Sequence, residues 1–237
     1  MNKRCGKMEI IFKESTQSTN EDAKALPENA DHIAVCAKTQ TGGHGRLGRK
    51  WISPAGNLYV SFCIRLDGLA AAGNYSFLSA VALAQTLESF GLKPLCKWPN
   101  DLLIDGKKVS GILLETDGKS RLIAGIGVNL LPVDAEGLMY PVTSLASEGV
   151  TSTPQEVLNR LIERFEALEK QPFSTVLEEW QRRAYGLGQP ITVNLPTGKL
   201  QGTFYGLDKN GVLLLKCGQQ IIKITAGDVF FGEQGKK

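Results

Sequence analysis

A glycine-rich basic loop is the segment of this sequence with the clearest capacity for chemistry. It reads Gly42-Gly43-His44-Gly45-Arg46-Leu47-Gly48-Arg49-Lys50-Trp51. Glycines let the backbone approach a ligand closely, and the side chains of Arg46, Arg49 and Lys50 can neutralise phosphate charge. Walker A loops and dinucleotide fingerprints precede helices, whereas this loop precedes an expected strand. Taken alone it predicts either a lid over a phosphate ligand or a solvated surface loop.

A second polar segment surrounds an expected hairpin. Lys97-Trp98-Pro99-Asn100-Asp101 is followed by an Asp105-Gly106 turn and then by Lys107-Lys108-Val109-Ser110-Gly111-Ile112-Leu113-Leu114-Glu115. Because an Asp-Gly pair favours a tight hairpin, Asn100 and Asp101 should lie near Lys108. These groups could hold an anionic ligand with a polar head group. The alternative, a hairpin with an ordinary charged edge, is slightly favoured by the residues alone.

Two shorter segments are ambiguous. Gly125-Ile126-Gly127-Val128-Asn129 ends an expected strand, where glycines either admit a flat ring or mark a bulge or tight packing. Ser18-Thr19-Asn20 precedes a short helix, where a serine N-cap requires no ligand. In isolation, both segments favour the structural interpretation.

Hydrophobic periodicity predicts the elements that must position these groups. Residues 57–66 alternate as a half-buried strand, and the apolar spacing in residues 74–90 predicts a helix that ends before Gly91. A strand at about 121–130 follows. Thr153-Pro154-Gln155-Glu156 is typical of a capping box that opens a helix, and another helix is expected at about 173–185.

The sequence pattern changes after Gly186, from helical spacing to short β-rich segments. Short β-rich segments at 191–195, 199–206, 212–217 and 220–225 are separated by turn residues, which predicts a small β-barrel. The predicted fold class is therefore α+β: an α/β-type sheet backed by helices in residues 1–186, followed by a small β-barrel domain in residues 187–237.

Composition excludes several classes of protein. The net charge of +3 is too small to indicate a dedicated nucleic-acid binder. No signal peptide or membrane span is expected, which predicts a cytoplasmic protein. The five cysteines are scattered and never in C-x-x-C spacing, so neither a disulfide framework nor a zinc site is predicted. With only two histidines, a Ser-His-Asp triad has no specific support.

The order of the segments is more informative than any one of them. Ser-Thr-Asn, a Gly/Arg loop ending in Arg-Lys-Trp, Lys-Trp-Pro-Asn-Asp, Lys-x-x-Gly-Ile-Leu-x-Glu and Gly-x-Gly-x-Asn follow one another over residues 15–130. This series resembles the biotin protein ligase family. The resemblance implies a class II aminoacyl-tRNA synthetase-like catalytic domain with an SH3-like C-terminal barrel. It also implies activation of biotin to biotinyl-5′-AMP with ATP and Mg²⁺, and transfer of biotin to a lysine of a biotin carboxyl carrier protein.

The resemblance also implies roles for individual residues. Lys108, Arg46 and Asp101 are the expected catalytic residues, and no protein ligand for a metal is assigned. The biotin-binding residues implied are Ser18, Thr19, Asn20, Gln40, His44, Gly45, Arg46, Lys108 and Gly111. The nucleotide-binding residues implied are Arg46, Arg49, Trp51, Lys97, Asn100 and Asn129.

The sequence departs from the family pattern in two places. The family loop usually reads Gly-Arg-Gly-Arg, and His44 replaces the first arginine here. Repressor members carry an N-terminal helix-turn-helix domain, whereas this sequence begins almost directly at the catalytic region, so DNA is not an expected partner. Family members often form dimers through a sheet edge, which leaves a homodimer open.

Three rival interpretations remain at this point. A lipoate or octanoate ligase would use the same activation chemistry in a different pocket. A sensor that binds biotin without catalysis would release no pyrophosphate. A nucleic-acid-binding module built on the C-terminal strands would bind DNA or RNA in a salt-sensitive way.

Overall fold

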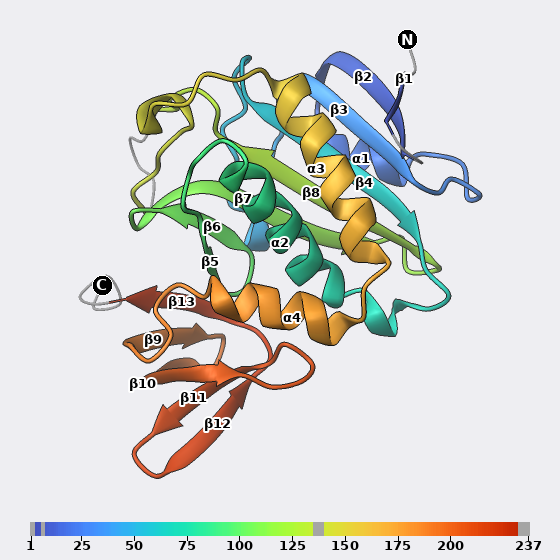
Figure 1. Cartoon of the computed structure of the whole chain (residues 1–237). Helices are drawn as coiled ribbons and strands as arrows, with labels where there is room; N and C mark the ends of the chain where they lie inside the picture. The colour runs from blue at the N-terminus through green and yellow to red at the C-terminus, as the bar shows by residue number, and fades with distance from the viewer. Residues whose placement is uncertain (1–2, 6–7, 135–139, 232–237) are drawn as a thin grey trace.

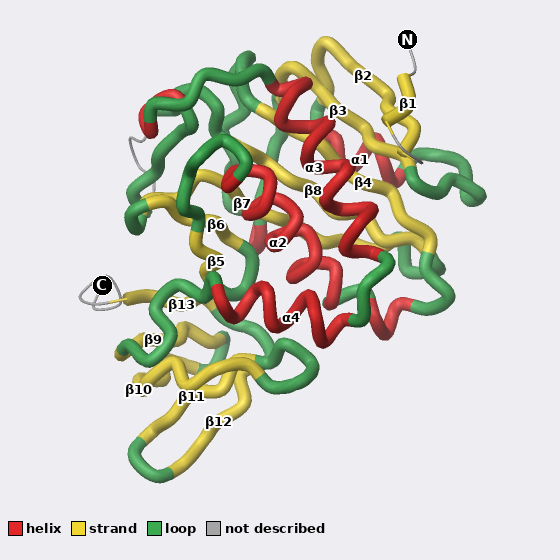
Figure 2. The backbone as a smooth tube through the Cα atoms, in the orientation of Figure 1, coloured by secondary structure: helices red, strands yellow, loops and turns green. Residues whose placement is uncertain are grey.

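Two β-sheets organise the chain in a computed structural model, which describes residues 3–5, 8–134 and 140–231 (Figures 1 and 2). The large sheet has the strand order β1-β2-β3-β4-β8-β7-β6-β5, in which only β2 and β3 are parallel. Its strands are β1 (Lys3–Cys5), β2 (Met8–Thr16), β3 (Ile33–Gln40), β4 (Leu58–Arg65), β5 (Leu95–Lys97), β6 (Asp101–Ile104), β7 (Lys107–Thr116) and β8 (Arg121–Val128).

Helices cover both faces of this sheet unequally. The helices are α1 (Thr19–Lys24), α2 (Asn74–Glu88), α3 (Pro154–Glu169) and α4 (Phe173–Arg182). Figure 1 shows α2 and α3 side by side against one face, with α1 behind the sheet. The main core forms where the α2–α3 pair meets Val60, Phe62 and Ile64 of β4. Among the described helices, the other face carries the short helix α1.

Strand β4 corrects one expectation. Its residues alternate as predicted, but the segment from Leu58 to Ile64 is buried throughout, so the strand is not half-buried. Tyr59, Ser61 and Cys63 point away from the main core and are covered by α1 and the segments around it. An alternating strand can be buried on both faces when small and polar residues fill the second face.

The other predicted elements are confirmed, with shifts of a few residues at their ends. The Asp105-Gly106 turn joins β6 to β7, and both turn residues have positive φ. The Thr153 hydroxyl accepts a hydrogen bond from the Glu156 N–H at 3.2 Å and so caps α3. The Glu156 carboxylate bonds Ser152 and Arg160, so only one half of the expected capping box forms.

The C-terminal domain is an antiparallel sheet of five strands. They are β9 (Pro190–Leu195), β10 (Gly198–Leu207), β11 (Leu213–Cys217), β12 (Gln220–Ile224) and β13 (Asp228–Phe231), in the order β12-β11-β10-β9-β13. The expected small β-domain is confirmed. However, β12 and β13 do not pair with each other in the described residues, so the sheet is not closed into a complete barrel. Strand β13 was not predicted, because its four residues, two of them phenylalanines, show little alternation.

The turn between β10 and β11 of the small sheet contacts the first domain. The Trp98 indole N–H donates to the Gly211 carbonyl at 3.2 Å, and a Cβ at Gly211 would lie 2.4 Å from the Phe77 ring.

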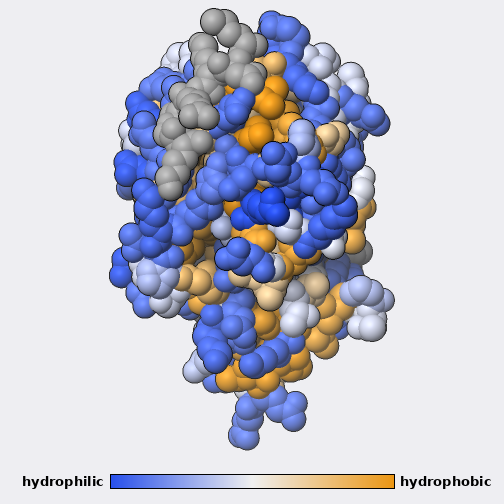
Figure 3. Space-filling view, turned by 90° about the vertical axis from the view of Figure 1, so that its right-hand side faces the viewer, coloured by the Kyte–Doolittle hydropathy of each residue, from blue (hydrophilic) through white to orange (hydrophobic). Residues whose placement is uncertain are grey.

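Figure 3 shows a mostly hydrophilic face with hydrophobic patches, the lowest of them over the small sheet. Within the described residues, no helix is both long and apolar enough to span a membrane.

Arg121 ties α1 to the large sheet, which leads to a first prediction. Its buried guanidinium pairs with Asp117 at 2.8 Å and donates to the carbonyls of Lys24, Leu26 and Pro27. Hydrogen bonds from Arg121 hold the pKa of Asp117 well below its ordinary value of 3.8, so the pair stabilises the fold at neutral pH and weakens on acidification.

Arg121→Met is expected to lower the free energy of unfolding by about 3 kcal/mol, because it leaves Asp117 Oδ2 and three carbonyls without their side-chain donor. Urea denaturation at pH 7 measures the change. Arg182→Met is the control, since Arg182 pairs with Glu179 on the exposed surface of α4 and should cost less than about 1 kcal/mol. Equal losses in the two variants would contradict the prediction.

Candidate functional site

A cavity of about 340 Å³ opens on the face of the large sheet that carries α1. Segments from both sheets line it, from Ser18 in the first part of the chain to Val229 in β13. Every residue assigned to the site from the sequence lines this cavity: Ser18, Thr19, Asn20, Gln40, His44, Gly45, Arg46, Arg49, Trp51, Lys97, Asn100, Asp101, Lys108, Gly111 and Asn129. The structure thus brings together four segments that are far apart in the sequence.

One part of the cavity is an uncharged hydrogen-bonding cluster. The Gln40 Oε1 atom accepts from the Thr19 N–H at 2.9 Å and from the Thr19 hydroxyl at 3.1 Å. The Ser61 hydroxyl lies 2.5 Å from Asn20 Oδ1 and 2.7 Å from Thr19 Oγ1. These hydrogen bonds orient the donors and acceptors of the cluster.

This cluster corrects the interpretation of Ser18-Thr19-Asn20 as a helix cap. Ser18 occupies the N-cap position of α1, but its side chain makes no capping hydrogen bond. Thr19 and Asn20 lie inside the helix and are buried. Ser61 was missed by the sequence analysis. Its place on the second face of an alternating strand is the signal that could have identified it.

A second part of the cavity is cationic. Lys108 Nζ lies 2.6 Å from Asp101 Oδ1, so the expected approach across the hairpin is confirmed. Lys97 is buried, with Nζ 4.1 Å from the centroid of the Tyr140 ring, and burial lowers the pKa of its amine. Among the described lining residues, five cations (Arg46, Arg49, Lys50, Lys97 and Lys108) face two carboxylates, Asp101 and Asp228. That excess favours an anionic ligand.

Two asparagines of the predicted nucleotide site are held by the backbone. Asn100 Nδ2 donates to the Ile112 carbonyl at 2.5 Å, and Asn129 Nδ2 donates to the Thr143 carbonyl at 3.1 Å. Each amide nitrogen is therefore engaged by the protein. The orientation of both side chains is fixed by these contacts.

The glycine-rich loop reaches across the cavity to the small sheet. Arg46 donates to the Gly227 carbonyl at 3.3 Å, and Arg49 pairs with the Asp228 carboxylate at 3.0 Å. Leu47, at the tip, has φ of 57° and is 82% exposed. Asp228 was not predicted as a site residue, because the strand that carries it was not predicted.

The strand glycines accommodate side chains of the protein. A Cβ at Gly127 would lie 2.5 Å from the Trp51 indole, and a Cβ at Gly125 would lie 2.2 Å from Asn20 Oδ1. A Cβ at Gly111 would lie 3.1 Å from both Lys108 Nζ and the Trp51 ring. The glycines therefore admit a flat ring close to the sheet, which was one of the two alternatives for Gly125 and Gly127. The ring is that of Trp51.

Comparison with known proteins agrees with this geometry. The model of the Biotin/lipoate A/B protein ligase family matches residues 9–130, and that of the Biotin protein ligase C terminal domain matches residues 186–232. A biotin–[acetyl-CoA-carboxylase] ligase of Paracoccus denitrificans is 37% identical over 92% of this chain and 98% of its own length. A bifunctional ligase/repressor BirA of Bacillus subtilis is 32% identical over 94% of this chain and 74% of its own length.

Solved structures show the same similarity. A biotin protein ligase from Aquifex aeolicus in complex with biotin and ATP superposes with a TM-score of 0.83 at 29% identity, covering 93% of this chain and 97% of that one. The family models, the curated relatives and the shared fold agree with the order of the sequence motifs. The chain belongs to the biotin protein ligase family.

Proposed function

We propose that the chain is a ligase that activates biotin with ATP and attaches it to a lysine of a biotin carboxyl carrier protein. One observation carries this proposal: a single cavity joins an ordered uncharged hydrogen-bonding cluster to a cluster of lysines and arginines. The first suits the ureido head group of biotin, and the second suits a carboxylate meeting a nucleotide phosphate. The related Aquifex structure holds biotin and ATP.

In the first step, an oxygen of the biotin carboxylate attacks the α-phosphorus of ATP. A bond forms between this oxygen and the α-phosphorus, and the bond between the α-phosphorus and the oxygen that bridges to the β-phosphate breaks. Pyrophosphate leaves, which gives biotinyl-5′-AMP. We assign Ser18, Thr19, Asn20, Gln40, His44, Gly45 and Gly111 to biotin. Lys108 and Arg46 stabilise the charge on the reacting oxygens. Arg49, Trp51, Lys97, Asn100 and Asn129 are assigned to the nucleotide.

Mg²⁺ is part of the proposal as a partner of ATP. It would neutralise charge on the phosphate oxygens. Oxygen ligands suit this ion, and Asp101 and Asp228 are the carboxylates that the described cavity lining offers. Both carboxylates pair with cations of the protein, Lys108 and Arg49. We therefore assign the ion mainly to phosphate oxygens and water rather than to a protein cage.

In the second step, the amine of the acceptor lysine attacks the carbonyl carbon of the mixed anhydride. An amide bond forms, and the bond between the carbonyl carbon and the phosphate oxygen breaks. AMP leaves, and the amine loses a proton. Asp101 lines the cavity beside Lys108, and its carboxylate could orient this amine by accepting a hydrogen bond. We assign Asp101 this role.

The remaining proposals concern the setting of the reaction. Residues 1–186 are proposed as the biotin- and ATP-binding part, and residues 187–237 as a smaller part that adds Asp228 to the nucleotide side. We propose a cytoplasmic enzyme. DNA binding is not included, because a net charge of +3 gives no strong attraction to phosphate backbones. Measurement of the mass of the protein in solution tests for a homodimer.

The glycine-rich loop is proposed as a lid that excludes water from the reactive anhydride. Biotin with ATP is expected to slow trypsin cleavage after Arg46, Arg49 and Lys50 by about tenfold, because a bound ligand stabilises the closed loop. Mass spectrometry of the fragments measures this. The bond after Lys209, in an exposed turn of the small sheet, should be cut at the same rate with and without ligands. Equal protection at both places would contradict a local lid.

The proposed function is tested by pyrophosphate release with ATP and Mg²⁺ in the presence of biotin, with lipoate as the control. An unmodified biotin carrier domain is added in a parallel reaction. Release with biotin and a gain in carrier mass establish both steps. Biotin binding without pyrophosphate or carrier modification would reject catalysis in favour of a sensor, and a preference for lipoate would reject the biotin assignment.

A further inference from the structure

Glu115 does not line the cavity, yet it contacts a residue that does. It lies near the end of β7, with its side chain about one quarter exposed. Its Oε2 atom accepts from Asn20 Nδ2 at 2.7 Å, and its Oε1 atom accepts from Lys24 Nζ at 2.8 Å. Burial by itself would raise the pKa of Glu115, but the bonds from Lys24 and Asn20 outweigh it and hold the pKa below 4.5. The side chain is therefore a carboxylate at neutral pH.

A carboxylate at this place fixes which way the Asn20 amide points. An ionised carboxylate can only accept hydrogen bonds, so the NH₂ group of Asn20 must face Glu115. The amide oxygen then faces the opposite way, where the Ser61 hydroxyl lies 2.5 Å from it. Ser61 has a single hydroxyl hydrogen, which it donates to this oxygen, so the Thr19 hydroxyl, 2.7 Å from Ser61, can donate its own hydrogen either to Ser61 or to Gln40. The donors and acceptors of the uncharged cluster thus depend on the charge of Glu115.

Packing leaves Asn20 little freedom to adjust. Asn20 is 4% exposed, and the backbone of Gly125 lies so close that a Cβ there would be 2.2 Å from Asn20 Oδ1. Held between β8, Ser61 and Glu115, the side chain can respond to a changed partner mainly by flipping its amide. Such a flip would exchange the acceptor and the donor within the cluster.

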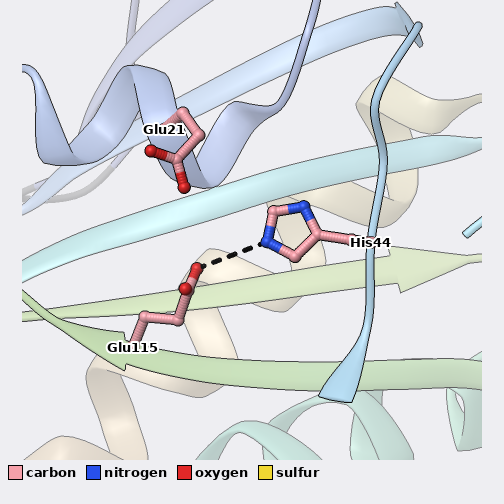
Figure 4. Close-up of side chains that lie close together, drawn as sticks. All are labelled: Glu21, His44 and Glu115. Carbon is pink, nitrogen blue, oxygen red and sulfur yellow. Dashed lines mark ion pairs between the residues drawn. The ribbon is translucent and has the colours of Figure 1, made fainter. Parts of the chain in front are cut away.

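The surroundings of Glu115 indicate an ion-pair cluster. Figure 4 shows Glu21 of α1 and His44 of the loop near Glu115. One carboxylate oxygen of each glutamate and one ring nitrogen of His44 lie within 4.8 Å of one another. His44 Nε2 lies 3.8 Å from Glu115 Oε2. The ammonium of Lys24 pairs with both Glu21 and Glu115, at 2.9 and 2.8 Å. Because the protein already places a cation between the two carboxylates, the group is better explained by ion pairing than by a bound metal.

We infer that Glu115 is a positioning residue for biotin recognition, acting through the amide of Asn20. This inference rests on the proposed function, because the cluster that Asn20 belongs to is assigned to the biotin head group. Glu115 itself is not among the residues that line the cavity. Its effect is to select one of the two amide orientations, and with it the pattern that the head group meets.

The first experiment compares Glu115→Gln with Glu21→Gln. The control removes a carboxylate that also pairs with Lys24 but has no contact with Asn20 among the described hydrogen bonds. Glu115→Gln is expected to raise the Kd for biotin by about tenfold, the effect of one hydrogen bond to a charged group. The KM for ATP and the melting temperature without ligand should stay close to those of Glu21→Gln.

A charge exchange separates orientation from general stability. Asn20→Asp puts a second carboxylate against Glu115 and is expected to weaken biotin binding by about a hundredfold through like-charge repulsion and loss of the bond. Adding Glu115→Gln to Asn20→Asp supplies an amide NH₂ that can donate to the new carboxylate at position 20, and keeps an acceptor facing Ser61. The double variant should therefore recover to within about tenfold of the wild type.

Three results would overturn the inference: wild-type affinity in Glu115→Gln, equal weakening by Glu21→Gln, or a double variant no better than Asn20→Asp. A joint rise of the biotin Kd and the ATP KM with a lower melting temperature would indicate a merely structural role. If the wild type itself does not bind biotin, the proposed function is rejected instead. The two failures are therefore distinguishable.

Discussion

Lys108→Ala is expected to reduce biotin-dependent pyrophosphate release by a factor on the order of 10² to 10³. Lys108 Nζ is held at the cavity by Asp101 at 2.6 Å and lies 5.4 Å from the centroid of the Trp51 ring. A fixed cation stabilises negative charge on the reacting oxygens without reorganising during the step, and loss of one such group typically costs this factor. The loss should appear mainly in kcat/KM, measured with a coupled pyrophosphate assay.

Lys107→Ala provides the matched control for this measurement. Lys107 is the neighbouring residue on β7, is exposed and does not line the cavity. Its removal should leave the rate within about twofold, as is usual for a surface substitution away from the site. A Lys108→Ala enzyme that keeps a third or more of the wild-type rate would contradict the assignment. Thermal unfolding of both variants separates lost catalysis from lost structure.

Gly127→Ala is expected to weaken ATP binding by about tenfold or more and to lower the free energy of unfolding by about 1–3 kcal/mol. The new Cβ would lie 2.5 Å from the rigid Trp51 indole, so the ring must move out of its place in the cavity wall. Overpacking of this kind shifts the backbone or the ring. The KM for ATP and urea denaturation measure the two effects.

Gly73→Ala is a control for adding a methyl group at a glycine. Gly73 has φ of −58° and nothing within 4 Å of the added Cβ. It should be neutral or slightly stabilising. If displacement of the ring is the cause, Gly127→Ala added to Trp51→Ala should weaken ATP binding no further than Trp51→Ala alone. Additive losses would show that Gly127 acts in another way.

Much of the site could be predicted because its residues occur in compact motifs. The Asp105-Gly106 turn fixed the hairpin, and the hairpin register then brings Lys108 to Asp101. Likewise, alternation in β4 identified the strand and separated its two faces. In both cases the information is local, since it depends on residues a few positions apart.

Other parts could not be predicted, because they depend on contacts between distant segments. Ser61 joins the uncharged cluster only through α1, about 40 residues away in the sequence, and nothing near it signals that neighbour. Asp228 meets Arg49 across 179 positions. The N-cap interpretation of Ser18 failed for the same reason: local propensity favours a cap, while Thr19 and Asn20 beside it have partners in β3, β4 and β7.

The lining of the cavity begins at Ser18 and is completed by Asp228 and Val229 of the last strand. During synthesis, the chain therefore carries most of its motifs long before it has a complete site. Arg49 gains its carboxylate partner only when β13 has left the ribosome and joined the small sheet. A chain truncated before β13 lacks these two lining residues and the carboxylate partner of Arg49, so it cannot form the complete cavity.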